Sequence, residues 1–180
     1  MTEPVADEFV ESGELDVPLA EGGVDDRRDA VLLPVGRSDE RRVESLASTA
    51  AEVGGLMQST VCLLHVFTKP RFEQVAERLG YDSDAPPDPD EAARHVSPVR
   101  AVARQLGTPL RDYGSAMHIS GRVGETVSDE IVAAAEDVDA KQVLVGGRRR
   151  TPVGKVKTGS TAQRVLLDAP CPVTFVRDEE

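Results

Sequence analysis

Short apolar runs along the chain alternate with longer segments in which apolar residues recur every three or four positions. The runs lie at 30–35, 60–67, 115–120, 141–147 and 171–176. Continuous apolar runs of this length are typical of strands that are buried on both faces of a parallel sheet. The alternation therefore predicts an α/β fold, Rossmann-like, with an open, doubly wound, five-stranded parallel sheet and helices on both faces.

Capping residues and glycines indicate where the helices begin and end. Ser38 is a good N-cap for the first helix, and Gly54–Gly55 is expected to end it. A second helix is predicted over about 90–106, and a turn is predicted at Gly121–Gly124. The last helix is expected to begin near Ser160.

Charge is distributed unevenly along the chain. The net charge is −11, and residues 1–29 alone carry −8. This segment is polar and contains several Gly and Pro, so we interpret it as a flexible acidic tail before a single domain at 30–180. Arg outnumbers Lys by 17 to 4. This acidic, Arg-rich composition is typical of a halophilic protein in a high-salt cytoplasm. GC-rich coding would give the same excess of Arg.

Several classes of protein are disfavoured by composition. No apolar run approaches the ~18 residues of a membrane span, and the acidic N-terminus does not resemble a secretory signal. Cys62 and Cys171 lie in apolar stretches, as expected of buried thiols in a reducing cytoplasm. The three histidines lack the spacing of metal ligands, so we interpret them as core or surface residues. Nucleic-acid binding is unlikely for a pI of about 4.8 and 3% aromatic residues.

One segment departs from the acidic balance. Between Asp139 and Asp168 there is no acidic residue. The basic residues from 141 to 164 are Lys141, Arg148, Arg149, Arg150, Lys155, Lys157 and Arg164. Ligands of open parallel sheets bind beyond the carboxyl ends of the strands, where the strand order reverses. If the first and fourth strands are neighbours there, Pro34-Val35-Gly36 and Gly146-Gly147 share one crevice and the basic segment lies at its mouth.

The end of the basic segment has the character of an anion site. Gly159-Ser160-Thr161 opens a helix, where free N–H groups and the helix dipole favour an anion. The phosphate-binding fingerprints do not fit. Val156 follows Gly154-Lys155 where a Walker loop needs Ser or Thr, and no GxGxxG is present. Ser160 has no nearby partners for a catalytic triad.

These features together resemble the universal stress protein family. The resemblance covers roughly residues 30–177. It rests on the order of elements and on the stretches VLLPVGRS (31–38), GRVGETVSDEIVAAAE (121–136) and GSTAQRVLLDAPCPVTFV (159–176). The resemblance implies an adenine nucleotide alpha hydrolase-like sandwich that commonly dimerises. Some members of the family bind ATP and others do not.

The prediction of nucleotide binding depends on how closely this chain matches the family's phosphate loop, G-x2-G-x9-G-[ST]. Gly146 matches its first glycine, and Gly159-Ser160 matches its last pair. Arg149 stands at the middle glycine, although its guanidinium could itself hold a phosphate. Gly36 stands where the family tends to place an Asp near the adenosine. The resemblance therefore leaves two alternatives open, namely a nucleotide-binding member and a nucleotide-free interaction module.

The first alternative predicts ATP or a related adenine nucleotide, with Mg²⁺, in a regulatory role with at most slow hydrolysis. Its expected binding residues are Pro34, Val35, Gly36, Val66, Gly146, Gly147, Arg148, Arg149, Lys155, Lys157, Gly159, Ser160 and Thr161. The last strand is expected at a sheet edge, where the β-branched run from Val173 to Val176 would pair two copies as a homodimer.

Overall fold

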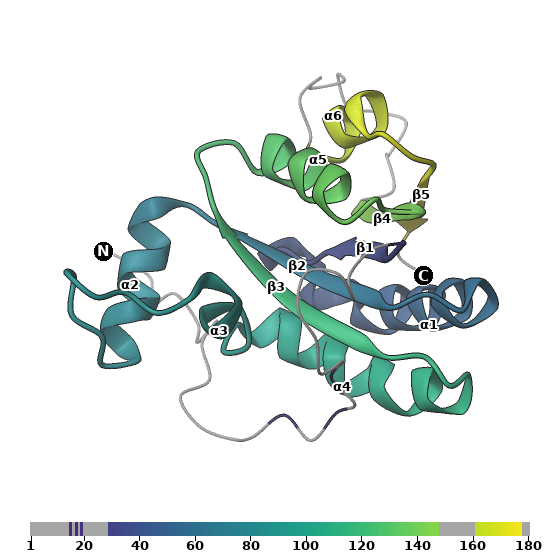
Figure 1. Cartoon of the computed structure of the whole chain (residues 1–180), viewed down its shortest axis with the longest axis horizontal. Coiled ribbons are helices and arrows are strands. Elements are labelled where there is room, and N and C mark those ends of the chain that lie inside the picture. The colour runs from purple at the N-terminus through teal and green to yellow at the C-terminus, as the bar shows by residue number, and fades with distance from the viewer. Residues whose placement is uncertain (1–14, 16, 18, 20–28, 148–160, 178–180) are drawn as a thin grey trace.

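The computed structural model describes residues 15, 17, 19, 29–147 and 161–177 (Figure 1). In this part of the chain, one parallel sheet contains five strands in the order β3-β2-β1-β4-β5. The strands are β1 (Val31–Pro34), β2 (Val61–Phe67), β3 (Met117–Val123), β4 (Gln142–Gly147) and β5 (Val173–Arg177). The predicted fold class is confirmed. The strand order reverses between β1 and β4, and β5 lies at one edge of the sheet, as expected.

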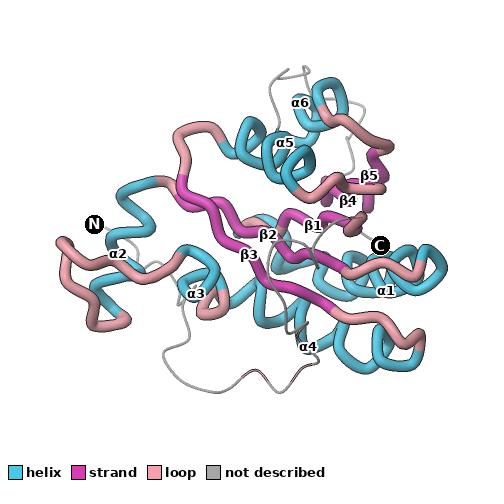
Figure 2. The backbone as a smooth tube through the Cα atoms, viewed as in Figure 1, coloured by secondary structure: helices cyan, strands magenta, loops and turns pink. Residues whose placement is uncertain are grey.

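Helices cover both faces of this sheet (Figures 1 and 2). They are the 3-10 helix η2 (Arg37–Arg42) and the α-helices α1 (Val43–Met57), α2 (Lys69–Arg78), α3 (Pro89–Ala93), α4 (Ser97–Asp112), α5 (Val127–Asp137) and α6 (Thr161–Asp168). Helices α1 and α4 pack on one face, and α5 and α6 pack on the other. Within the described ranges, no helix is long and apolar enough to cross a membrane.

Alternate residues of the central strands supply the two cores. In β1, Leu33 belongs to the core beneath α1 and α4, whereas Leu32 belongs to the core beneath α5. In β2, Leu63 belongs to the core beneath α1 and α4, and Leu64 belongs to the core beneath α5. All four side chains are at most 1% exposed. Burial on both faces is the reason that these strands appear in the sequence as continuous apolar runs.

The first helix differs from its prediction at the N-terminal end. Ser38 is not its N-cap, because η2 precedes α1 and the helix begins at Val43. The carboxylate of Asp39 accepts a hydrogen bond from the backbone N–H of Gly36 at 2.7 Å. This bond closes a tight turn directly after β1 and delays the start of the α-helix.

The predicted end of the same helix is also wrong. Gly54 and Gly55 are buried inside α1, which continues to Met57. Gln58 ends it instead, with φ of 51° in the left-handed region. A Cβ on Gly55 would lie 2.2 Å from the ring of Tyr113, so the glycine allows α1 and α4 to approach each other. Tertiary packing rather than chain termination explains this glycine pair.

Three further elements were not predicted correctly. Helix α2 was missed, and the helix predicted at 90–106 is divided into α3 and α4, with a Pro at position 98 in the first turn of α4. Gly121 does not begin a turn, because β3 continues to Val123. A Cβ at Gly121 would lie 1.9 Å from the carbonyl oxygen of Pro89, which passes directly over this strand.

Four residues of the N-terminal segment are described, namely Asp29 and three apolar residues that contact the domain. Leu15, Val17 and Leu19 are partly buried and pack against the core beneath α1 and α4. Leu19 forms a parallel bridge with Met117 of β3, the edge strand at the opposite end of the sheet from β5. Part of the acidic segment therefore adds to this edge. The flexibility of the remaining residues and the domain limits of 30–180 stay predictions.

Candidate functional site

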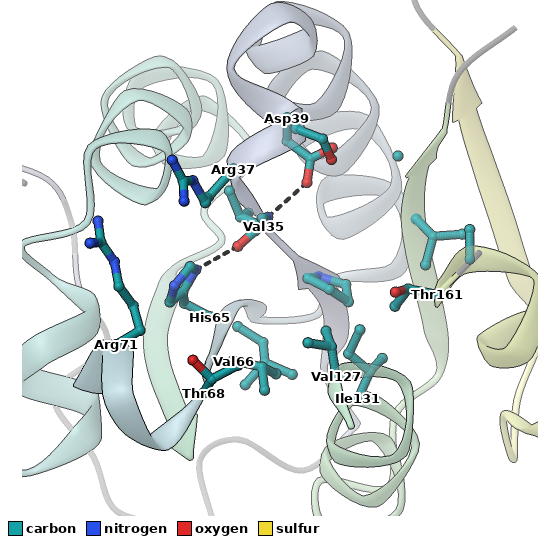
Figure 3. Close-up of a pocket in the computed structure, with 17 residues that line it drawn as sticks. Val35, Arg37, Asp39, His65, Val66, Thr68, Arg71, Val127, Ile131 and Thr161 are labelled. Atoms are coloured by element: carbon teal, nitrogen blue, oxygen red, sulfur yellow. Dashed lines mark hydrogen bonds between the residues drawn. The ribbon is translucent and has the colours of Figure 1, made fainter. Parts of the chain in front are cut away.

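A pocket of about 560 Å³ opens at the carboxyl ends of β1 and β4, where the strand order reverses (Figure 3). Its apolar wall is formed by Leu64, Val66, Val127, Ile131 and Val145. Its polar side chains are Arg37, Ser38, Asp39, His65, Thr68, Arg71 and Thr161. The volume is within the range of small-molecule and cofactor sites, which is about 300–1,000 Å³.

The pocket brings together six of the residues predicted for the site. These are Pro34, Val35, Gly36, Val66, Gly146 and Thr161. Gly147 does not line the pocket. The remaining predicted residues lie outside the described part of the chain, namely Arg148, Arg149, Lys155, Lys157, Gly159 and Ser160.

A buried ion pair closes the turn after β1. Arg42 donates from Nη1 to Asp39 Oδ1 at 2.6 Å, and the side chains of Arg42 and Asp39 are 3% and 10% exposed. The other oxygen of Asp39 accepts the N–H of Gly36. Although Gly36 has no side chain of its own, Asp39 therefore brings a carboxylate to the end of β1. The spacing of Gly36 and Asp39 is typical of a side chain at the start of a helix that accepts a backbone N–H three residues away.

The two glycines that end β4 have packing reasons that do not involve a ligand. A Cβ on Gly146 would lie 2.6 Å from Asp39 Oδ1 and 2.8 Å from Arg42 Cδ. A Cβ on Gly147 would lie 1.7 Å from Phe175 Cζ. Gly146 therefore leaves room for the ion pair of the neighbouring turn. The presence of these glycines is not by itself a sign of phosphate binding.

His65 fixes the end of β1 from the other side. Its side chain is buried, and its Nδ1 lies 2.8 Å from the carbonyl oxygen of Val35, to which it donates a hydrogen bond (Figure 3). Burial lowers the pKa of His65, the bond to Val35 opposes this effect, and the nearby positive charge of Arg71 lowers the pKa further. The ring is therefore neutral at neutral pH. The peptide between Val35 and Gly36 is held at both its C=O and its N–H.

The ionised side chains of the pocket are arranged asymmetrically. Arg37 and Arg71 lie on one side of Val35, and Thr161 lies on the other (Figure 3). Asp39 is the one acidic residue among the described lining residues, and Arg42 neutralises it. The lining is thus cationic on the side of Arg37 and Arg71. Arg71 could not be found from the sequence because α2 was not predicted.

Comparison with known proteins assigns this chain to a family. The family model described as "Universal stress protein family" matches residues 27–177. The chain belongs to the universal stress protein family. A universal stress protein of Mycolicibacterium smegmatis is 41% identical over 68 residues, which are 38% of this chain and 52% of that protein. The match therefore spans about half the length of that relative.

Other relatives of this universal stress protein match most of the chain. The protein of Thermus aquaticus described as "Universal stress protein in QAH/OAS sulfhydrylase 3'region" is 29% identical over 153 residues, covering 82% of this chain and 97% of its own. A universal stress protein of Archaeoglobus fulgidus has a TM-score of 0.51 at 25% identity, covering 82% and 97% of the two chains. A universal stress protein solved in complex with cAMP has a TM-score of 0.53 at 13% identity, covering 84% and 98%. At this identity the likeness to the cAMP complex shows the fold alone.

Proposed function

We propose that this universal stress protein binds ATP or a related adenine nucleotide in the pocket between β1 and β4, in a regulatory rather than a catalytic role in the cytoplasm. The observation that carries the proposal is the pocket itself, in which an apolar wall lies beside the first residue of α6 at the reversal of strand order. A base and a phosphate need these two environments side by side.

The apolar wall suits an adenine ring. Three side chains of this wall face the same space, namely Val66 on β2 and Val127 and Ile131 on α5 (Figure 3). Branched aliphatic side chains offer a planar base close contact on its faces without hydrogen-bonding groups that must be satisfied. The structure of a family member with cAMP supports an adenine nucleotide as the ligand of this fold.

The beginning of α6 suits the phosphates. Thr161 is the first residue of α6 and lines the pocket, so it offers a hydroxyl beside the positive end of a helix dipole. We propose that Gly159 and Ser160 complete the phosphate site, together with the cations Arg148, Arg149, Lys155 and Lys157. Arg149 would replace the missing glycine by pairing with a phosphate oxygen.

The described pocket residues suit binding better than turnover. Asp39 is occupied by Arg42 and Gly36, so it is not placed to accept a proton from water, and burial lowers the pKa of His65, which makes its ring a weaker base. No group of three metal-ligating side chains occurs among the described residues. We propose that any Mg²⁺ arrives bound to the phosphates and that hydrolysis is at most slow.

One observation favours a second candidate function. The N–H of Gly36 and the C=O of Val35 are already bonded to side chains, so β1 has less hydrogen-bonding capacity left for a nucleoside. This favours a nucleotide-free interaction module, which would act through protein partners. Such a module would show no response to nucleotides.

Edge strand β5 supports a proposal on assembly. Phe175 on β5 is 44% exposed, and Leu167 on the adjacent α6 is 73% exposed. We propose that two copies pair through Val173 to Val176 as a homodimer, which would cover these apolar side chains. In that case Phe175→Asp should convert a dimeric mass in light scattering to a monomeric one. A monomeric wild-type protein at micromolar concentration would contradict the pairing.

Thermal unfolding with and without nucleotide tests the binding proposal. A ligand at 100 times its Kd stabilises the native state by about 2.7 kcal/mol, so ATP, ADP, AMP and cAMP should raise the melting temperature. Thr161→Asp should abolish this effect without weakening the fold, because a carboxylate suits a helix N-terminus but repels a phosphate. Thr108→Asp, at an exposed position of α4 that does not line the pocket, is the control. If millimolar nucleotide with Mg²⁺ leaves the wild-type melting curve unchanged, the nucleotide-free module replaces this proposal.

A further inference from the structure

Strand β3 lies at the edge of the sheet opposite β5, and half of its backbone groups face away from the sheet (Figure 1). Directly before β3, the C=O of Ala116 accepts the N–H of Val61, and directly after it, the N–H of Gly124 donates to Phe67. The even-numbered residues therefore pair with β2, and the odd-numbered residues face outward. Outward N–H and C=O groups of an edge strand can pair with a further extended segment.

The carboxyl end of this edge is covered by α3. The N–H of Gly121 donates to Asp90 Oδ1 at 2.8 Å, and the hydroxyl of Ser120 donates to the same oxygen at 3.0 Å. The backbone of Pro89 passes so close that a Cβ on Gly121 would lie 1.9 Å from its carbonyl oxygen. An added segment can therefore extend along Met117 and Ile119 but not past Gly121.

Three apolar N-terminal residues lie on the part of the edge that α3 leaves accessible. Leu19 forms a parallel bridge with Met117. Leu15, Val17 and Leu19 all pack against the core that contains Met117 and Ile119. Their spacing of two residues is the pattern of a segment that turns alternate side chains toward one face. Main-chain pairing together with alternate side-chain contacts is the mode of recognition in β-strand addition.

The contact of these three residues with the domain is shallow. Their side chains are only partly buried. The N–H groups of Val17 and Leu19 donate to the carbonyl oxygens of Leu15 and Val17, at 2.9 and 2.8 Å, so neither of these donors pairs with β3. The three residues are therefore held at the edge mainly by side-chain packing, which a second identical segment can supply equally well.

The chain between these residues and the sheet is long enough for exchange between two molecules. Residues 20–30 join Leu19 to β1, which begins at Val31. When extended, this stretch can span about 40 Å, which exceeds the ~30 Å diameter of a small domain. The apolar residues can therefore reach either the β3 edge of their own chain or that of a neighbouring molecule.

We propose that the outer edge of β3 around Met117 and Ile119 is a strand-acceptor site, which Leu15, Val17 and Leu19 fill either in cis or in trans from a second copy. In the trans form each copy donates its segment to the other, so the contact closes as a symmetric dimer. This interface lies at the edge opposite β5, and it depends neither on nucleotide binding nor on pairing through β5.

A synthetic peptide of residues 13–21 tests whether the edge accepts the segment in trans. In the full chain, replacing Leu15, Val17 and Leu19 by Ser removes the cis segment from the edge without shortening the protein. NMR titration of this labelled variant should show shifts at Met117 and Ile119, and none at Thr174 on β5. A peptide with the same three serines is the matched control.

The expected affinity follows from the tether. Three partly buried apolar side chains should favour the filled edge over the empty one by about tenfold. A flexible tether gives an effective concentration in the millimolar range, so the peptide should bind the triple-serine variant with a Kd of about 0.1 mM. It should bind the wild-type chain about tenfold more weakly, because the cis segment competes with it. Equal binding of both peptides, or no binding to a variant that circular dichroism shows to be folded, overturns the acceptor site.

Small-angle X-ray scattering tests exchange between whole chains. Phe175→Asp is used as the background, because it disfavours pairing through β5. This chain should be monomeric at micromolar concentration and shift toward a dimer at millimolar concentration, where a second copy competes with the tethered segment. The same chain with the three serines should remain monomeric. A monomer in both chains at millimolar concentration, or a dimer in both, overturns the exchange.

Discussion

Replacing Asp39 by Asn should destabilise the domain strongly although the two side chains have the same shape. The Asn oxygen can still accept the N–H of Gly36, but the amide NH₂ then faces the guanidinium of Arg42. Arg42 is 3% exposed, so its charge would remain buried without the carboxylate. Its bond to the carbonyl oxygen of Ser38, at 3.2 Å, remains as partial compensation.

The size of the effect follows from this burial. Removing one partner of a buried ion pair costs about 3–5 kcal/mol, and the remaining Ser38 bond indicates the lower limit, about 3 kcal/mol. For a chain of this size, such a loss corresponds to a fall in melting temperature of roughly 6–12 °C. Urea unfolding followed by circular dichroism measures the free energy directly, because a change in midpoint with an unchanged slope reports stability.

Two further variants test the reasoning. Asp137→Asn removes one of the two acidic partners of Arg122, and Asp137 is 60% exposed, so the loss of stability should be below about 1 kcal/mol. The double variant Asp39→Ala with Arg42→Met removes both charges of this pair and should recover much of the stability lost in Asp39→Asn. If Asp39→Asn unfolds at the same urea concentration as Asp137→Asn, the ion pair at the end of β1 does not stabilise the fold as argued.

Three other changes should have measurable effects on stability. Because the pKa of His65 is lowered in the folded state, the unfolded chain binds more protons at acidic pH. The contribution of neutral His65 to the free energy of unfolding should be fully present above about pH 6.5 and should be lost as the pH falls below it. Urea titrations at several pH values should show that His65→Asn flattens this dependence. Gly121→Ala should lower the free energy of unfolding by about 3 kcal/mol, because the backbone of Pro89 must move. Gly147→Ala should lower it by about 1 kcal/mol, because the new methyl group meets the half-exposed ring of Phe175, which can rotate away. Calorimetric melting compares the two variants. Deleting residues 1–20 should cost about 1–2 kcal/mol through the loss of three partly buried apolar side chains, and an unchanged urea midpoint would show that their packing does not stabilise the domain.

The strands could be predicted because their signal is local. Leu32 and Leu33 are buried on opposite faces, so the whole run is apolar, and no other element is needed to interpret it. The end of α1 could not be predicted in this way. Gly55 resembles a helix stop, and only the ring of Tyr113, directly after α4, explains why a glycine stands inside α1.

In the candidate site, too, some residues could be predicted from the sequence and others could not. Residues at the ends of β1 and β4, such as Val35 and Gly146, could be predicted because strand order determines where they meet. His65 belongs to a buried strand, and its bond to Val35 spans two strands, so no sequence spacing indicates it. Arg71 lies on a helix with few apolar residues, whose buried positions become clear only when the helix is packed on the sheet.

The bridge between Leu19 and Met117 has a consequence for the order of folding. The residues of β1 and β2 pair across one helix, but Leu19 must wait for β3, which lies far along the chain. Closing so long a loop costs entropy before any contact offsets it, so this contact should form after the sheet has assembled. During synthesis, Leu19 leaves the ribosome before β3 and yet can dock only after β3 has formed. In the native protein the same contact should open first, and proteolysis of the terminus could then proceed while the five strands stay paired.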